Sequence, residues 1–452
     1  MFLSIDQYCA VWRSIDWFRL YDMNMFFTFA SRRGRQLLSA LGPGLLMAGA
    51  AVGVSHLVQS TRAGADYGTS LLLLVVLACV FKYPFLEFGP RYAAATGENL
   101  LQGYRRLGRW ALGLFVIITL GTMLIIQAGV TVVTAGLAGL VFGLDATMTQ
   151  LSAGVLFGCL VILSVGRYRG LDLMMKVIMA ALAVSTLAAV ALAFGSGPDW
   201  RVLDPTANLG AVWTATGFAF VLALLGWMPI PLDVAAWHSL WTLERAEQTG
   251  QRPSVRDAIT DFQIGYVGAT VLAVLFLLLG ALMIHGSGES LPQSGIAFSG
   301  RLVELYAQNL GEWSRPIIAV AALTTMFSTT LAVTDAYPRA LRALIEIGGI
   351  ATQDGSAEHK HSARYIGALL LISTGALAVI HFFGQRFTSL IDFATTVSFL
   401  AAPLIAWLNI KLLTSEHTPS QHRPRGALLA LAHAGLWFLI LFCVIWLGWR
   451  LL

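Results

Sequence analysis

The stretch 42-GPGLLMAGAAVGVSHLVQSTRAGADYG-68 decides the fold of this 452-residue chain. It contains an apolar run long enough to cross a bilayer, because a helix needs about 20 apolar residues for the crossing. Near the middle of that run, however, lie Gly53, Ser55, His56 and Gln59. Ionisable side chains at membrane depth are costly and usually functional. The stretch therefore predicts a spanning helix that is interrupted at a functional site.

The composition of the whole chain is that of an integral membrane protein. It is 57% hydrophobic and 12% charged, with a mean hydropathy of +0.73. Runs such as 71-LLLLVVLACV-80 are apolar on every side, which indicates helices, because the strands of a β-barrel alternate. Eleven spans are predicted in one bundle, with no soluble domain: 43–63, 68–93, 110–139, 148–166, 171–195, 210–240, 260–284, 313–337, 363–384, 388–412 and 427–449.

Basic residues set the expected orientation, since cytoplasmic loops retain Lys and Arg. They concentrate in the extension at 1–41 and in alternate loops. We therefore expect a bacterial-type inner membrane, a cytoplasmic N-terminus and an external C-terminus. The pI near 9.1 then reflects this topology and contact with anionic membrane lipid, and no nucleic-acid partner is expected. The four cysteines show no metal-type spacing and no cofactor is expected, while the oligomeric state stays open.

A second interruption lies in 226-GWMPIPLDVAAWHS-239, where Pro229 and Pro231 cannot both belong to one unbroken helix. The two interruptions fall in the first and sixth spans. Corresponding breaks five spans apart are typical of inverted-repeat transporters, whose substrate site lies at the midplane between the broken helices. We therefore predict a first repeat at 42–195, a second repeat at 210–412 and an extra helix at 427–449.

The first of these stretches resembles a known family signature. Residues 42–68 are similar, without gaps, to the first-helix signature of the natural-resistance-associated macrophage protein (NRAMP) transporters. Met228-Pro229 and His238-Ser239 are similar to the family's motifs in the sixth helix. The resemblance implies an all-α membrane protein of the LeuT-type fold, with a 5+5 inverted repeat, one extra helix and discontinuous helices 1 and 6. It also implies secondary active transport of divalent metal cations coupled to protons.

This sequence departs from the family pattern at the positions that carry the chemistry. The family's Asp-Pro-Gly-Asn motif falls on 53-GVSH-56, so its carboxylate is absent. In the sixth span, alignment from Met228 places Ile230 at the family's histidine, whereas alignment from His238 places Asp233 there, and both remain open. The third span holds no Asp or Glu, although the family keeps acidic residues for its proton route there.

Several side chains near the two breaks are candidates for binding or coupling. A neutral imidazole or a thioether favours transition metals, a carboxylate binds cations, and hydroxyl and amide oxygens can complete a site. The substrate-binding candidates are Gly53, Ser55, His56, Gln59, Met228, Pro229, Ile230 and Asp233. The metal candidates are His56, Asp233 and Met228, and the coupling or gating candidates are His56, Asp233, His238 and Thr395.

Each of these residues also has a structural interpretation. His56 could instead bond the backbone carbonyls of its own break, and Asp233 could cap the half-helix that follows it. In the second span, Lys82 and Glu87 are expected to pair or to face water near the cytoplasmic end, in a structural or gating role. Asp335 and Arg339 are expected to form an i,i+4 ion pair.

The leading functional prediction is an NRAMP-related secondary transporter of a divalent metal cation with an altered site. One alternative is a carrier of a small organic or other non-metal solute, since exposed half-helix N-termini can hold a carboxylate. Another is a non-transporting membrane sensor or scaffold of the same fold. An enzyme is not expected, because no paired carboxylates, metal-binding His cluster or activated nucleophile recurs at fixed spacing.

Overall fold

The computed structural model describes residues 42–165, 168–195, 197, 200–286, 291–292, 295–348, 363–383 and 387–451. The expected extension at 1–41 lies outside these residues. Within them the chain is helical and contains no strand. The main helices are α4 (Pro43–Ala51), η1 (Val54–Ser60), α5 (Thr61–Tyr67), α6 (Leu72–Thr96), α7 (Leu100–Leu107), α8 (Arg109–Phe142), α9 (Met148–Val165), α10 (Tyr168–Gly195), α11 (Leu209–Val212), α12 (Ala215–Trp227), α13 (Val234–Thr249), α14 (Val255–Met283), α15 (Gly295–Leu310), α16 (Arg315–Ile347), α17 (Ala363–Phe383), α18 (Phe387–Thr414) and α19 (Gly426–Leu451).

These helices supply the eleven spans expected from the sequence. In the described part of the chain, seven are long and apolar enough to cross a membrane, namely α6, α8, α14, α16, α17, α18 and α19. Shorter apolar helical segments occur in α9, α10 and α12. The remaining span is the broken helix 1, formed by α4, η1 and α5. Helix 6 is broken as well, since it consists of α12 and α13, and it extends to Thr249, beyond the predicted end at 240.

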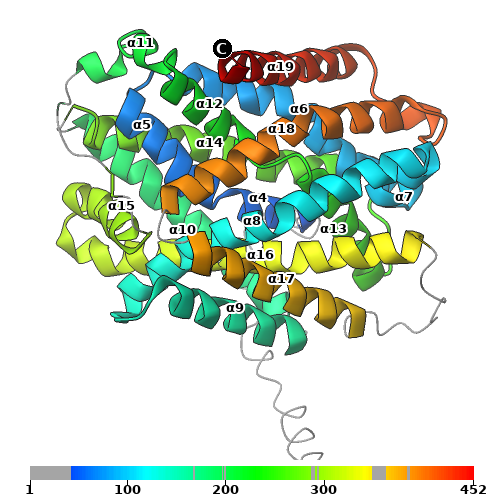
Figure 1. Cartoon of the computed structure of the whole chain (residues 1–452), viewed down its shortest axis with the longest axis horizontal. Coiled ribbons are helices and arrows are strands. Elements are labelled where there is room, and N and C mark those ends of the chain that lie inside the picture. The colour runs from blue at the N-terminus through cyan, green and yellow to red at the C-terminus, as the bar shows by residue number, and fades with distance from the viewer. Residues whose placement is uncertain are drawn as a thin grey trace, which may run out of the picture. The chain divides into compact units, whose positions relative to one another are not determined.

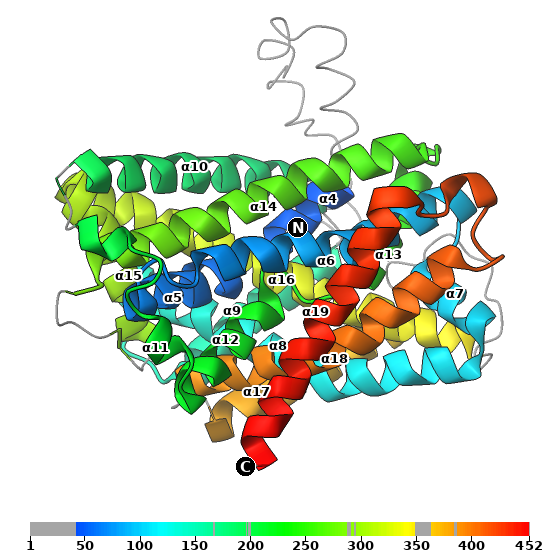
Figure 2. The same ribbon diagram turned by 90° about the horizontal axis from the view of Figure 1, so that it is seen from above.

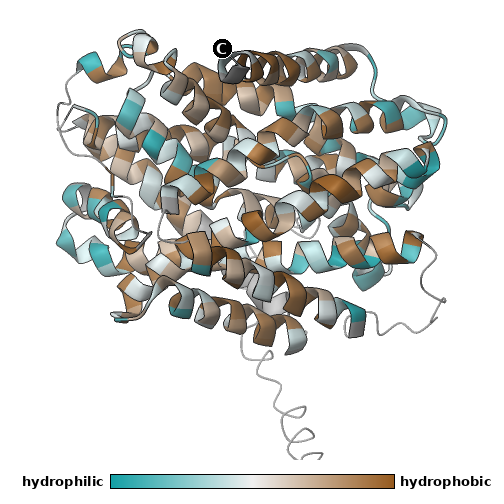
Figure 3. Cartoon of the chain, viewed as in Figure 1, coloured by the Kyte–Doolittle hydropathy of each residue, from teal (hydrophilic) through white to brown (hydrophobic). Residues whose placement is uncertain are grey.

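Hydropathy and burial separate central helices from peripheral ones. Hydrophilic residues gather near helix ends, for example on α7 and α15, whereas hydrophobic residues cover the middles of the helices (Figure 3). The most apolar window of α16 is 67% buried within the protein, but that of α19 is only 22% buried. Helix α16 is therefore surrounded by other helices, whereas α19 lies against α6 and α18 with much of its apolar surface left for lipid (Figure 2).

Equivalent helices pair in equivalent ways across the two halves of the fold. The second half of helix 1, α5, packs along α14 (Figure 1). The second half of helix 6, α13, packs along α6. The third and eighth spans, α8 and α16, pack against each other. A five-helix inverted repeat generates these pairings, namely helix 1 with helix 7, helix 6 with helix 2, and helix 3 with helix 8.

The contact between α5 and α14 is close because glycine lies on both sides of it. A Cβ atom at Gly64 would overlap the carbonyl oxygen of Leu277, and one at Gly280 would overlap the carbonyl oxygen of Thr61. Small residues allow helix backbones to approach each other in this way. The second half of helix 1 is thereby held on α14, which fixes the position of the break that precedes it.

Candidate functional site

The break in helix 1 is short and depends on one glycine. Helix α4 ends at Ala51, and the chain resumes as a π-helix at Val54. A Cβ atom at Gly53 would lie 2.8 Å from both Cγ2 and Oγ1 of Thr329 on α16. The Thr329 hydroxyl in turn donates to the Gly49 carbonyl oxygen at 2.7 Å. The absence of a side chain at Gly53 therefore brings the break against α16.

Two polar side chains close this break from within. The Ser55 hydroxyl lies 2.6 Å from the Ala51 carbonyl oxygen and 2.7 Å from His56 Nδ1. His56 Nε2 lies 2.8 Å from the Ala269 carbonyl oxygen of α14. Because a carbonyl oxygen can only accept, Nε2 carries the proton. Both nitrogens of His56 thus have protein partners, and neither is open to a metal ion in this structure.

The amides that follow the break lie at the start of a helical segment. The π-helix begins at Val54, so Val54 and Ser55 are its first two residues. The first N–H groups of a helix lack the acceptors that a preceding turn would supply. The Val54 and Ser55 amides are therefore candidate donors beside the break.

The break in helix 6 is longer and is closed by a different kind of group. It runs from Met228 to Asp233 and includes the cis Met228-Pro229 bond. Pro229 has no N–H to donate to the Leu225 carbonyl, so that acceptor is left without its helical partner. The ammonium of Lys82 on α6 donates to the carbonyl oxygens of Leu225 at 2.6 Å, Gly226 at 2.9 Å and Ile230 at 3.4 Å. Three acceptors match the three donors of a protonated amine, so the break can hold a positive charge supplied by another helix.

Lys82 is the functional candidate that the sequence analysis placed wrongly. It lies near the middle of α6, with 1% of its surface exposed, and not near an end of the helix. Its neighbour Glu87 does form the expected pair, with Arg91 at 2.5 Å. Two features of the sequence could have indicated that Lys82 contacts the helix 6 break. Lys82 is the one lysine of its predicted span, and Pro229 leaves a backbone carbonyl of the sixth span without its helical donor.

The three candidate metal ligands do not converge. His56 is engaged with Ser55 and α14 as described above. Asp233 is buried, and its Oδ2 has no hydrogen-bond partner within the described residues. The sulfur of Met228 lies 3.9 Å from the Ser60 hydroxyl. Among the described residues, no group of three or more His, Cys, Asp or Glu is placed to hold a metal ion.

The remaining candidates lie away from the breaks. Gln59 Nε2 donates to Asp392 Oδ1 at 3.1 Å and to the Thr395 hydroxyl at 3.4 Å. Arg62 forms two hydrogen bonds with the Asp392 carboxylate, at 2.6 and 3.1 Å, and these tie α5 to α18. His238 on α13 is buried against Phe262, and neither ring nitrogen has a hydrogen-bond partner within the described part of the chain.

A second ion-pair cluster ties α13 to α16. Arg339 contacts Asp335 at 2.6 Å, which confirms the predicted i,i+4 pair, and Glu244 at 3.0 Å. The Tyr365 hydroxyl of α17 donates to Asp335 at 2.7 Å. This cluster joins helix 6 to α16, and the pair between Arg62 and Asp392 joins helix 1 to α18. Each broken helix is thus tied to a neighbouring helix by an ion pair.

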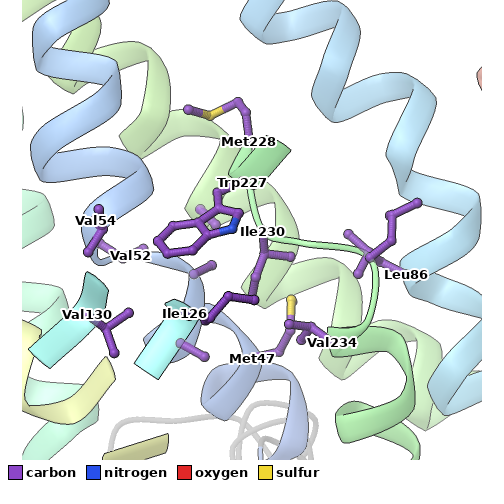
Figure 4. Close-up of a cluster of buried hydrophobic side chains, with 14 of the residues drawn as sticks. Met47, Val52, Val54, Leu86, Ile126, Val130, Trp227, Met228, Ile230 and Val234 are labelled. Atoms are coloured by element: carbon purple, nitrogen blue, oxygen red, sulfur yellow. The ribbon is translucent and has the colours of Figure 1, made fainter. Parts of the chain in front are cut away.

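A small cavity lies between the two breaks, α8 and α16. Its volume is about 20 Å³, which is enough for one water molecule. Trp227, Ile230 and Ile126 lie between the broken segments in Figure 4. The walls are mostly apolar, and Ser55 and Thr329 contribute the hydroxyl groups. The lining residues are Ala50, Val54, Ser55, Ile126, Val130, Trp227, Ile230, Pro231, Val234, Trp237, Thr329 and Val333.

Comparison with known proteins gives a family and a fold. The family model described as natural resistance-associated macrophage protein-like matches residues 44–449. An uncharacterised protein of Pasteurella multocida is 36% identical over 419 residues, which cover 91% of this chain and 93% of that protein. The divalent metal cation transporter MntH of Bradyrhizobium diazoefficiens is 22% identical over 305 residues, or 66% of each chain.

Solved structures of two kinds share the fold. A variant of the Eremococcus coleocola manganese transporter superposes with a TM-score of 0.70 at 16% identity, covering 91% of this chain and 86% of that one. The nucleobase-cation-symport-1 family transporter MHP1, with bromovinylhydantoin bound, gives a TM-score of 0.55 at 14% identity over 90% of this chain and 92% of that one. At these identities the likeness concerns the fold alone.

Proposed function

The chain belongs to the NRAMP family, and we propose that it is a secondary transporter whose central site takes a small organic solute in place of a metal ion. Members of this family are membrane transporters, so the chain is a transporter of the NRAMP kind and not an enzyme. The proposal concerns what it carries and where the solute binds.

The chemistry of the cavity between the breaks carries the proposal. A divalent cation requires several oxygen, nitrogen or sulfur ligands that replace its water shell. The side chains that line this cavity are almost all apolar, and Asp233, His56 and Met228 are not among them. An apolar pocket with a few placed polar groups is instead typical of sites for small organic molecules.

The polar groups beside the cavity favour a solute with an acceptor group. The amides of Val54 and Ser55, the first two residues of the π-helix, are candidate donors, and the partial positive charge of a helix start attracts carboxylate or carbonyl oxygen. The apolar walls formed by Ile126, Val130 and Trp227 suit a compact hydrocarbon body. The present cavity holds only one water molecule, so the solute enters a wider state of the same site, which alternating access provides.

A divalent metal cation is the second candidate substrate, because family membership favours it. The MntH relative is named for this activity. In this chain it requires that His56 leave its partners and that Asp233 and Met228 turn into the cavity. The two candidates therefore make opposite predictions for direct metal binding.

The arrangement in the membrane forms part of the proposal. We place the N-terminus in the cytoplasm and the C-terminus outside a bacterial-type inner membrane, because basic residues concentrate in the corresponding loops. Residues 42–195 and 210–412 are the two repeats, and 427–449 is the extra helix. The equivalent packing of α5 on α14 and of α13 on α6 supports this division.

Calorimetric titration of the purified protein with Mn²⁺ and Mg²⁺ tests the choice of substrate. We expect no saturable heat with either ion, and a raised unfolding temperature with at least one member of a panel of small carboxylates such as lactate, pyruvate and proline. Uptake of that compound into proteoliposomes should be lost in Ala50→Leu, which fills the cavity. Saturable Mn²⁺ or Mg²⁺ binding would establish the metal candidate, and no ligand and no uptake of any kind would favour a non-transporting sensor or scaffold.

A further inference from the structure

Lys82 is a buried cation without a carboxylate partner. Only 1% of its surface is exposed, and the ion pairs of the described residues include none to its ammonium. Asp233 belongs to the same break, but within the described residues its carboxylate forms no hydrogen bond or ion pair with Lys82. Within the described part of the chain, the hydrogen bonds of Lys82 all go to backbone carbonyls of the helix 6 break. Such burial of a charge is costly, so a specific role for it is expected.

The carbonyls that hold Lys82 form a site suited to a cation. Leu225 and Gly226 lie in the last turn of α12, where unpaired carbonyls and the helix dipole create partial negative charge. Ile230 adds a carbonyl from the extended segment after Pro229. An ammonium has three donors, and three carbonyl oxygens surround it here. In broken-helix transporters, unwound carbonyls and half-helix C-terminal ends are where a coupling cation binds.

We propose that Lys82 is a tethered cation that occupies the cation site of the helix 6 break, so that this break closes without a free metal or sodium ion. The consequence for transport rests on the proposed function. If the solute is organic, the carrier needs no separate cation to order α12 and α13. It also accounts for Gly53 at the position of the family's first-helix carboxylate. That carboxylate binds a free metal ion, and no such ion is needed where Lys82 supplies the positive charge.

Hydrogen–deuterium exchange of the protein in nanodiscs tests the proposal without any solute. The readout is the exchange of peptides that cover residues 222–234, with peptides from α19 as an internal reference. In the unchanged protein, we expect protection of this segment to be the same in choline chloride, NaCl and MnCl₂ at equal ionic strength. Protection that rises on adding Na⁺ or Mn²⁺ would show that a free ion occupies the break and would overturn the proposal.

Three variants separate a cation site from simple packing. Lys82→Ala should exchange at least about tenfold faster over 222–234 and should regain protection when methylammonium is added, because the vacated space accepts a small cation. Lys82→Met should exchange equally fast but should not respond to methylammonium, because its side chain fills that space without charge. Lys82→Arg keeps the charge and should remain protected.

The outcomes are distinguishable even where one variant does not fold. If Lys82→Ala yields no folded protein, retained protection in Lys82→Arg and lost protection in Lys82→Met support the proposal. Full protection in Lys82→Met, or methylammonium-insensitive exchange in a folded Lys82→Ala, would overturn it. Failure to find an organic substrate would remove the proposed function but would leave this result standing, since no substrate enters the experiment.

Discussion

The two broken helices solve the same physical problem in different ways. Helix 1 leaves the helical path only at Val52 and Gly53, and Ser55 and His56 close the gap with hydrogen bonds to nearby carbonyls. Helix 6 is unwound over six residues, and an ammonium from α6 compensates its carbonyls. In the short gap, neighbouring polar side chains supply the missing hydrogen bonds. The longer gap contains prolines and leaves several carbonyl oxygens, each with a partial negative charge, close together, and a positively charged group stabilises them. The first break therefore depends on the close packing of Gly53 against Thr329, and the second depends on the interaction of the Lys82 ammonium with backbone carbonyls.

Reversing the charge at the second break is expected to have the largest effect. Lys82→Glu would place a carboxylate against three carbonyl oxygens in a site that excludes water, which we expect to cost at least about 4 kcal/mol. Little folded protein should survive size-exclusion chromatography. The matched control is Lys411→Glu, which reverses an exposed charge beside Trp110 and should lower the unfolding temperature only slightly. Equal behaviour of the two variants would contradict an electrostatic role for Lys82.

Adding one methyl group at the first break should have the next largest effect. Gly53→Ala brings Cβ to 2.8 Å from Thr329 Cγ2 and Oγ1, and such overpacking costs about 1–3 kcal/mol. Thr329→Ala removes both atoms, so the double variant should recover part of the loss in a double-mutant cycle measured by thermal unfolding. Gly121→Ala on α8, where nothing lies within 4 Å, is the control and should not destabilise the protein. Strict additivity at Gly53 and Thr329 would refute the close contact.

Two buried histidines provide a matched comparison between the broken helices. His56→Phe removes both hydrogen bonds of the helix 1 histidine and should lower stability by about 1–3 kcal/mol, because the buried Ala269 carbonyl loses its imidazole donor and the Ser55 hydroxyl loses one of its partners. His238→Phe replaces a ring whose nitrogens have no hydrogen-bond partner among the described residues, so it should be neutral or stabilising. Unfolding midpoints in detergent measure both changes. The reverse order would show that His238, and not His56, carries the hydrogen-bonded role.

The smallest effect is expected in the second half of helix 1, at Arg62. Asp392→Asn removes the ion pair with Arg62, whose side chain is 13% exposed while that of Asp392 is 34% exposed. Partly solvated pairs of this kind contribute about 1 kcal/mol or less, and salt weakens them. The unfolding temperature of Asp392→Asn should therefore differ slightly from that of the unchanged protein at low salt, and the difference should shrink at high salt. A large loss that salt does not alter would indicate a buried structural role instead.

Much of the fold was predictable because its signals are local. Apolar runs of spanning length predicted eleven helices, and the described helices supply them. Gly53 and the Pro229-Pro231 pair predicted the two breaks, since glycine and proline act on their own backbone. The i,i+4 pair of Asp335 and Arg339 was predictable for the same reason.

The site was predictable in position but not in detail. The sequence determined that polar groups lie at two breaks in a membrane bundle, because their local cost and spacing are visible in one chain segment at a time. Only the tertiary structure decided that His56 turns to Ala269, that Gln59 joins Asp392, and that Lys82 reaches Leu225, Gly226 and Ile230. These partners are 143 or more residues apart in the chain. Hydropathy and spacing describe what each helix requires, whereas the packing of one helix against another determines which group meets that requirement.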